Sequence, residues 1–207
     1  METAAELFDV SPVVPVVVID EIEHAVPVAR ALAAGGVRII ELTLRTPVAL
    51  QAIERVHTEV PEIVLGAGTV TTPEQADQAA RAGAAFLVTP GSTDRVLNAV
   101  AATGLPFLPG VSTVSEAMRV AERGVRELKF FPAEASGGVD YLRAINAPLP
   151  ELRFCPTGGV TPESAPQYLA LPNVGCVGGT WLTPKDALAS GDFGRVEALA
   201  KAAASLR

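Results

Sequence analysis

The sequence has few of the residues that form disulfides or hold metals. It contains two cysteines, Cys155 and Cys176, and their spacing matches neither a C-x-x-C motif nor a zinc site. Both fall in predicted strands, so we expect buried, reduced and inert thiols. The two histidines, His24 and His57, fall on predicted helices away from the strand ends. A magnesium held by carboxylates stays an alternative, but no pair of acidic residues at strand ends indicates one.

Positive charge, aromatic residues and long apolar runs are also scarce. Lys and Arg number 16 against 23 Asp and Glu, the net charge is −7, and aromatic residues make up 5% of the chain. Without a basic stripe, we expect no nucleic-acid partner. No segment reaches the roughly 18 apolar residues of a membrane span, and the acidic start METAAE differs from a signal peptide. These features predict a cytoplasmic protein with no membrane partner.

The sequence does contain a repeated unit of about 20 to 25 residues, in which an apolar β-branched run precedes a small-residue turn and a helical stretch. The predicted strands are 14–19, 37–43, 63–67, 86–89, 107–109, 127–131, 153–157 and 174–177. The predicted helices are 22–34, 47–60, 72–82, 93–102, 114–123, 139–145, 162–169 and 193–206.

Strands that alternate with helices predict a parallel sheet, and almost wholly apolar strands predict that helices cover both of its faces. Eight such units fit an α/β fold of the closed (β/α)8 TIM barrel type. We expect a single domain over residues 1–207, with a short N-terminal helix. The alternative is an open doubly wound sheet, but no G-x-G-x-x-G motif follows the first strand.

Several predicted helices begin with capping residues. Thr72 and Thr161 each precede a proline, which is typical of an N-cap followed by the first helical position. The segment Thr113-Val114-Ser115-Glu116 has the pattern of a capping box.

Lys129 lies within an apolar run that predicts a buried strand. An ammonium group rarely enters a protein core unpaired, because its removal from water costs several kcal/mol. Burial favours loss of the charge, and the neutral amine is a nucleophile toward carbonyls. The alternatives are a structural salt bridge with Glu127 or Glu41, or a side chain that extends to the surface.

A second polar set follows the predicted strand 37–43. Side chains alternate along a strand, so Glu41, Thr43 and Arg45 share the face opposite Leu42. The polar set should face the barrel interior near the catalytic, carboxyl-terminal end of the strands. The same alternation points Lys129 inward, so Lys129 and Glu41 should both face the interior. A purely structural Glu–Arg pair is the alternative.

Glycine clusters end three of the predicted strands. Gly158-Gly159 and Gly178-Gly179 follow the last two strands, and Thr180 adds a hydroxyl to the second pair. TIM barrels often bind phosphate with the loops in these two positions through free backbone N–H groups. These pairs predict a phosphate site. The segment 66–69, GAGT, offers a further hydroxyl from Thr69.

With these residues assembled, the chain closely resembles the 2-keto-3-deoxy-6-phosphogluconate (KDPG) aldolases and 4-hydroxy-2-oxoglutarate (KHG) aldolases. The resemblance runs from Pro12 to the last predicted helix. Its most specific segments are ELTLR at 41–45, GAGT at 66–69, KFFPAE at 129–134 and FCPTGG at 154–159. Members of this family are cytoplasmic, metal-free, trimeric (β/α)8 barrels of the Entner–Doudoroff pathway that need no cofactor.

The resemblance also implies roles for individual residues. Lys129 matches the Schiff-base lysine, and Glu41 matches the general acid/base. Arg45 and Thr69 match the residues that hold the pyruvate carboxylate. The other matches are Pro90 and Phe131 in the keto-acid pocket, Thr157 as a polar contact to the substrate, and Gly158, Gly159, Gly179 and Thr180 in the phosphate loops. The family leads us to expect serine at position 180, so the additional methyl of Thr180 would tighten the pocket.

The implied function is a class I (Schiff-base) aldolase, a carbon–carbon lyase of carbohydrate metabolism. It would cleave 2-dehydro-3-deoxy-6-phosphogluconate to pyruvate and glyceraldehyde 3-phosphate and would also accept 4-hydroxy-2-oxoglutarate. The alternatives are a 2-dehydro-3-deoxy-6-phosphogalactonate aldolase, another phosphosugar isomerase or epimerase, or a non-catalytic barrel. The expected partners are these small molecules and the other subunits of a homotrimer.

Overall fold

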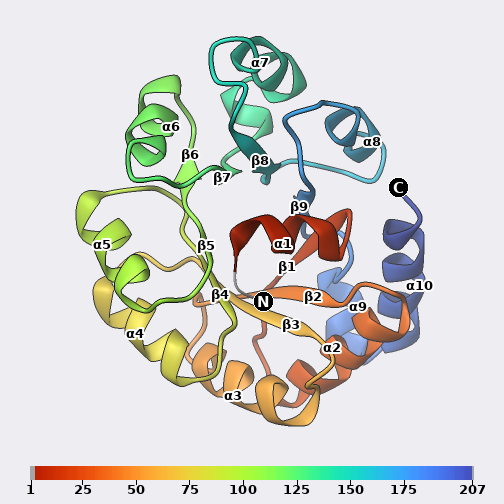
Figure 1. Cartoon of the computed structure of the whole chain (residues 1–207). Coiled ribbons are helices and arrows are strands. Elements are labelled where there is room, and N and C mark those ends of the chain that lie inside the picture. Colours follow the sequence, from red (N-terminus) through yellow and green to blue (C-terminus); the bar gives the residue numbers. More distant parts are fainter. Residues whose placement is uncertain (1–2, 207) are drawn as a thin grey trace.

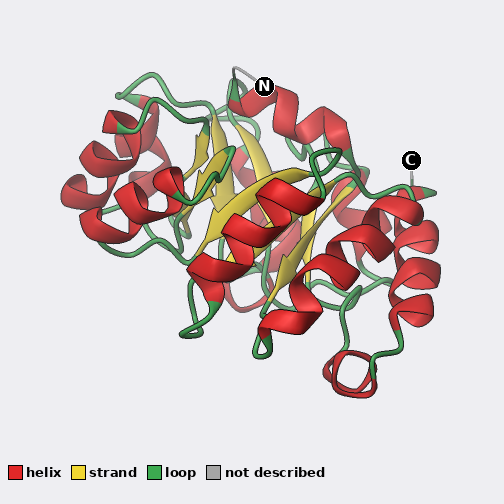
Figure 2. Cartoon of the chain, turned by 90° about the horizontal axis from the view of Figure 1, so that it is seen from below, coloured by secondary structure: helices red, strands yellow, loops and turns green. Residues whose placement is uncertain are grey.

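The computed structural model describes residues 3–206 and has an α/β fold. Parallel strands lie at the centre and helices surround them (Figures 1 and 2). The strands of the described part are β1 (Val13–Val17), β2 (Ile39–Thr43), β3 (Val64–Gly68), β4 (Phe86–Val88), β5 (Phe107–Leu108), β6 (Gly110–Val111), β7 (Glu127–Phe130), β8 (Arg153–Pro156) and β9 (Val177–Gly179).

Helices connect most of these strands and pack against the outside of the sheets. They are α1 (Ala4–Val10), α2 (Ala25–Ala34), α3 (Ala49–Glu59), α4 (Pro73–Arg81), α5 (Asp94–Ala102), α6 (Val114–Ala121), α7 (Gly138–Ile145), α8 (Ala165–Leu169), α9 (Lys185–Ser190) and α10 (Phe193–Ala204), with 3-10 turns η1 (Ile22–His24) and η2 (Glu134–Ser136). The alternation predicted from the sequence is confirmed, although α9 was not predicted.

The strands form two parallel sheets, in the orders β5-β4-β3-β2-β1-β9 and β6-β7-β8. The two sheets meet at two junctions. At the first, the chain changes its partner strand at Pro109, so the predicted strand 107–109 covers only β5, and β6 follows as a separate strand. Residues before Pro109 pair with β4, and residues after it pair with β7. At the other junction, isolated parallel bridges join Phe154 to Val174 and Thr157 to Gly178.

The last strand lies later in the chain than the sequence predicted. The prediction was 174–177, whereas β9 covers Val177–Gly179 and pairs with β1. Gly178 and Gly179 therefore belong to a strand and not to the loop after it. The predicted end of the strand was wrong because a glycine pair is typical of a turn. Here the two glycines lie within the strand, where Cβ atoms would overlap the side chains of Thr157 and Trp181.

Apolar side chains explain why the strands are buried. Every residue of β1 and β2 is buried, and the core extends to both faces of the sheets. Thr72 caps α4 with Pro73 in its first turn, and Thr113 with Glu116 forms the predicted capping box of α6. The Thr161 hydroxyl accepts from the Ser164 backbone N–H at 3.3 Å, as a cap does. The predicted helix start at Pro162 was wrong, because residues 162–164 form a turn and α8 begins only at Ala165.

Helix α1 lies near the centre of the molecule in Figure 1, across one end of the strands. Its Phe8 is fully buried and packs against Gly175, just before β9 begins. The guanidinium of Arg153, at the start of β8, lies 5.3 Å from the centre of the Phe8 ring. Helix α1 therefore covers the amino ends of the strands, and the carboxyl ends stay available for a site. Among residues 3–206, no helix is long and apolar enough to cross a membrane.

Candidate active site

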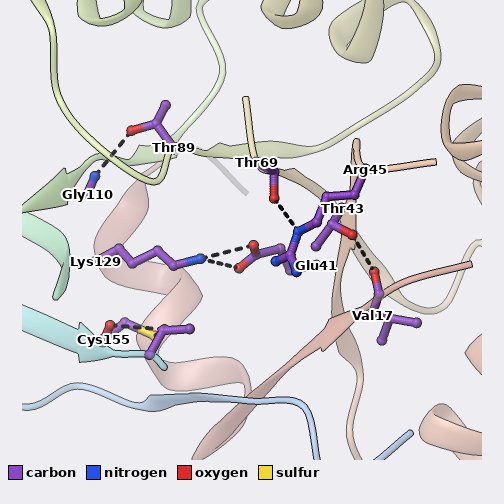
Figure 3. A network of polar contacts seen from close by, with 10 residues as sticks. Val17, Glu41, Thr43, Arg45, Thr69, Thr89, Gly110, Lys129 and Cys155 are labelled. Carbon is purple, nitrogen blue, oxygen red and sulfur yellow. Dashed lines mark hydrogen bonds and ion pairs between the residues drawn. The ribbon is translucent and has the colours of Figure 1, made fainter. Parts of the chain in front are cut away.

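Lys129 and Glu41 meet inside the molecule, as the alternation of side chains predicted. The Nζ atom of Lys129 on β7 lies 3.1 Å from Oε1 and 3.3 Å from Oε2 of Glu41 on β2. The two residues are 5% and 3% exposed. Figure 3 shows the side chains pointing toward each other from opposite strands. The predicted salt bridge with Glu41 is therefore present, and it places a carboxylate within proton-transfer distance of the amine.

A glycine on the neighbouring strand makes room for the Glu41 carboxylate. Gly68 ends β3, which pairs with β2. A Cβ atom at Gly68 would overlap Oε1 and Cγ of Glu41. Thr43, the next residue of the predicted polar set, instead donates a hydrogen bond from its hydroxyl to the Val17 carbonyl at 3.1 Å. Thr43 thus links β2 to β1, and Glu41 is the strand residue that faces Lys129.

Arg45 and Thr69 form a second polar pair beside the first (Figure 3). Arg45 lies in the exposed turn after β2, and its Nε donates to Oγ1 of Thr69 at 3.0 Å. Thr69 has a φ of 59°, a left-handed conformation that is strained for a β-branched residue. Such strain is typical of functional sites, where the surrounding structure holds a side chain in place. Here it directs a hydroxyl toward the guanidinium.

These residues surround a cavity of about 220 Å³ at the carboxyl ends of the strands. The Nζ atom of Lys129 lies 5.5 Å from the centre of the Phe131 ring, which forms one wall. Nine of the eleven site residues predicted from the sequence line it: Arg45, Thr69, Pro90, Lys129, Phe131, Thr157, Gly158, Gly159 and Thr180. The other lining residues are Gly178, which belongs to the second glycine pair predicted to bind phosphate, and Val16 and Val160, which the sequence did not predict.

Two predicted site residues do not line the cavity. Glu41 is connected to the cavity through its hydrogen bonds with Lys129. Gly179 was predicted in a phosphate loop, but it belongs to β9, where a Cβ atom would overlap the ring of Trp181. Its neighbour Gly178 lines the cavity instead. A Cβ atom at Gly178 would overlap the Thr157 side chain, so this position also requires glycine.

The loop after β8 contributes Gly158 and Gly159 to the cavity. Their φ angles are 100° and 84°, so both residues adopt the left-handed region that favours glycine. Thr157, immediately before them, is buried, and its hydroxyl lies 3.3 Å from the Cys155 carbonyl. The loop therefore exposes backbone and a hydroxyl to the cavity, which suits an anionic group.

A larger hollow of about 690 Å³ adjoins this cavity and shares Val16, Arg45 and Thr180 with it. Cys155 and Cys176 are buried, as expected, and neither forms a disulfide within the described part of the chain. Within residues 3–206, no group of three or more His, Cys, Asp or Glu side chains is arranged to hold a metal ion.

A buried lysine paired with a carboxylate beside a cavity with an exposed arginine is the arrangement that a Schiff-base enzyme acting on a keto acid requires. The model for the family of KDPG and KHG aldolases matches residues 5–199. The 2-dehydro-3-deoxy-phosphogluconate aldolase of Dickeya dadantii is 53% identical, over 97% of this chain and 94% of the relative. The KHG/KDPG aldolase of Escherichia coli K12 is 51% identical, over 98% and 95%.

Solved structures agree with this assignment. A crystal structure of KDPG aldolase from Legionella pneumophila, with pyruvate captured at low pH as a covalent carbinolamine intermediate, superposes with a TM-score of 0.96. It is 44% identical and covers 98% of both chains. The chain belongs to the KDPG and KHG aldolase family.

Proposed function

We propose that this protein is a class I aldolase that cleaves 2-dehydro-3-deoxy-6-phosphogluconate to pyruvate and glyceraldehyde 3-phosphate. The observation that carries the proposal is the buried Lys129 Nζ, 3.1 Å from the Glu41 carboxylate at the wall of a cavity. A lysine buried for structural reasons alone would not require an adjoining cavity with an arginine and three glycines in its wall.

The first steps join the substrate to Lys129. Proton transfer from the Lys129 ammonium to Glu41 leaves a neutral amine, whose lone pair attacks the keto carbon. Transfer of a proton from nitrogen to oxygen gives a carbinolamine. Glu41 then returns its proton to the departing hydroxyl, water leaves, and a cationic iminium remains. The 3.1 Å separation between Lys129 Nζ and Glu41 Oε1 allows the first of these transfers to occur directly.

The iminium accepts the electrons of the bond that breaks. The Glu41 carboxylate takes the proton of the hydroxyl on the carbon beyond this bond, and the hydroxyl oxygen forms the aldehyde carbonyl. The bonding pair moves into the iminium and gives a neutral enamine. Protonation of the enamine carbon by Glu41 gives the cationic iminium of pyruvate, and water hydrolyses it to release pyruvate and restore the Lys129 ammonium.

The cavity residues would orient the two ends of the substrate. Arg45, whose Nε is held by Thr69, can bind the carboxylate bidentately and fix the keto carbon in front of Lys129. Pro90 and Phe131 would pack on the keto-acid half. The phosphate would bind at the other side of the cavity, against Thr157, Gly158, Gly159, Gly178 and Thr180.

The gluconate-derived substrate is favoured over the galactonate-derived one, because the curated relatives at 53% and 51% identity bear the KDPG name. The second of them also supports activity on 4-hydroxy-2-oxoglutarate. Membership of an aldolase family leaves the isomerase, epimerase and scaffold alternatives without support.

We also propose that the two sheets form one closed (β/α)8 barrel in a single domain. The support is the continuous segment from β5 to β6 and the bridge between Thr157 and Gly178. A homotrimer is proposed from the family resemblance, and light scattering coupled to size-exclusion chromatography would measure the mass. The cytoplasmic location stays a prediction from the sequence.

The test of the function is the rate of pyruvate release from the two phosphorylated keto acids and from 4-hydroxy-2-oxoglutarate, with and without a chelator. We expect the highest kcat/KM for the gluconate-derived substrate and no effect of the chelator. Release of no pyruvate from any of the three by folded protein would refute the proposal.

A further inference from the structure

The side chain of Glu134 packs directly against the glycine loop after β8. A Cβ atom at Gly159 would lie 2.6 Å from Cγ of Glu134. The Glu134 backbone N–H also donates to the Gly158 carbonyl at 3.1 Å, and the N–H of Ala133 donates to the Thr157 carbonyl at 2.8 Å. The 3-10 turn η2 and the glycine loop are therefore joined by backbone bonds as well as by side-chain packing.

Tyr168 holds the other end of the Glu134 side chain. Its hydroxyl donates to Oε1 of Glu134 at 2.7 Å. Tyr168 lies on α8, the helix that follows the glycine loop, and its side chain is among the largest fully buried in the described part of the chain. Burial, and then the hydrogen bond to Glu134, raise the pKa of Tyr168, so the hydroxyl stays protonated and donates. One hydrogen bond thus connects η2 to α8 across the loop.

This contact places a carboxylate beside a loop suited to an anion. An unrestrained carboxylate there would repel a phosphate, and it could also move over the cavity. The bond from Tyr168 fixes the Glu134 side chain, and Gly159 leaves the space that its methylene groups occupy. Neither residue lines the cavity, so any effect on the substrate must pass through the loop.

We infer that Tyr168 and Glu134 are positioning residues that hold the Gly158-Gly159 backbone in the geometry that binds the phosphate group of the substrate. The inference rests on the proposed function. It assigns the pair to the phosphate end of the substrate and separates it from the chemistry at Lys129, which the pair does not touch.

The experiment compares two readouts in the full-length protein. The KM for the phosphorylated keto acid reports on the phosphate loop. The exchange of deuterium from solvent into the methyl group of pyruvate reports on the imine and enamine at Lys129, without any phosphate. Tyr168→Phe should raise the KM about five- to tenfold, less than the full cost of a hydrogen bond to a charged group because the loss reaches the substrate only through the loop, and should leave the exchange rate within about twofold.

A control variant at Tyr141 and two variants of Glu134 test whether the change in KM comes from the hydrogen bond between Tyr168 and Glu134. Tyr141, the other tyrosine of the chain, stacks on Phe130 with ring centres 5.3 Å apart, so Tyr141→Phe removes a hydroxyl outside the loop and should not change the KM. Glu134→Ala should raise the KM as Tyr168→Phe does, and Glu134→Gln, which retains an acceptor, should recover most of the affinity. The double variant Tyr168→Phe/Glu134→Ala should be no worse than Glu134→Ala alone.

An unchanged KM in both Tyr168→Phe and Glu134→Ala would overturn the inference, and so would a parallel loss of binding and exchange. If Tyr168→Phe does not fold, the pair Glu134→Ala and Glu134→Gln decides. Failure of the proposed function is distinguishable, because the wild-type protein itself would then exchange no deuterium into pyruvate.

Discussion

The two ends of the strands use charged residues in opposite ways. At the amino ends, the charge of Arg153 lies over the Phe8 ring, and α1 covers that end of the ring of strands (Figure 1). At the carboxyl ends, Lys129 and Glu41 are paired with each other next to a cavity of about 220 Å³. The same sheets thus carry an end built for packing and an end built for chemistry. Substitutions at the two ends should therefore affect different properties.

The largest expected effect is at the carboxyl ends. Lys129→Arg retains a positive charge near Glu41, but a guanidinium does not form an imine with a keto acid. We expect kcat to fall by at least about 10³-fold, as is typical when a covalent nucleophile is lost. Pyruvate release measures this effect. Activity above one tenth of the wild-type value would mean that Lys129 serves only as a charge.

Glu41→Gln separates two steps of the chemistry at the same end. The amide can still accept a hydrogen bond from Lys129 but cannot transfer protons, so kcat should fall about 10²- to 10⁴-fold. Imine formation with pyruvate should remain detectable by borohydride reduction. Loss of the imine together with turnover, in protein with a normal circular dichroism spectrum, would contradict this expectation and show that water cannot replace Glu41 in imine formation.

Phe8→Ala tests the opposite end. Phe8 is fully buried against Gly175, and removal of a buried phenyl ring costs about 3–5 kcal/mol of the free energy of unfolding. Urea unfolding measures the loss, and kcat/KM of the folded protein should stay within about twofold. A large change in kcat/KM with little loss of stability would show that the two ends are coupled.

The smallest expected effect concerns Glu116, an acidic residue at the carboxyl ends of the strands that contributes to stability and not to the cavity. Glu116 follows β6 at this end, but its carboxylate accepts hydrogen bonds from the backbone N–H groups of Ser112 and Thr113 as part of the α6 capping box. The Ser112 backbone bond is the main cause that lowers the pKa of Glu116 below its ordinary value of 4.5. Glu116 therefore stabilises the fold and has no contact with the cavity.

Because the pKa is lowered by folding, this stabilisation is present above about pH 4.5 and is lost as the pH falls through the lower, folded value. Glu116→Gln should reduce the free energy of unfolding by about 1 kcal/mol at pH 7, and the difference from the wild type should shrink below pH 4.5. Urea unfolding at the two pH values measures this. A constant difference across the range would contradict the assignment.

Local sequence patterns predicted the contacts that depend on the direction in which a side chain points from its strand. The alternation of side chains in β2 and β7 predicted that Glu41 and Lys129 face inward, and the two residues meet at 3.1 Å. The capping box of α6, the cap at Thr72 and the order of strands and helices were predicted for the same reason. In each case the residues that interact lie close together in the chain, or on strands whose direction is fixed by a parallel sheet.

Other features depend on contacts between distant segments. Gly178 and Gly179 resemble a turn, yet they are strand residues whose missing side chains accommodate Thr157 and Trp181. The bond from Tyr168 to Glu134 joins residues 34 positions apart, and neither residue type signals the other in the sequence. Such contacts become visible only once the segments are placed in space.

The central claim is that Lys129 forms a covalent imine with the keto acid. The most direct measurement is borohydride reduction of the wild-type protein in the presence of pyruvate, followed by mass spectrometry of the intact chain and its peptides. We expect one stable adduct, on the peptide that contains Lys129, and none in Lys129→Arg. Folded protein that binds pyruvate but gives no adduct, or an adduct on another lysine, would contradict it.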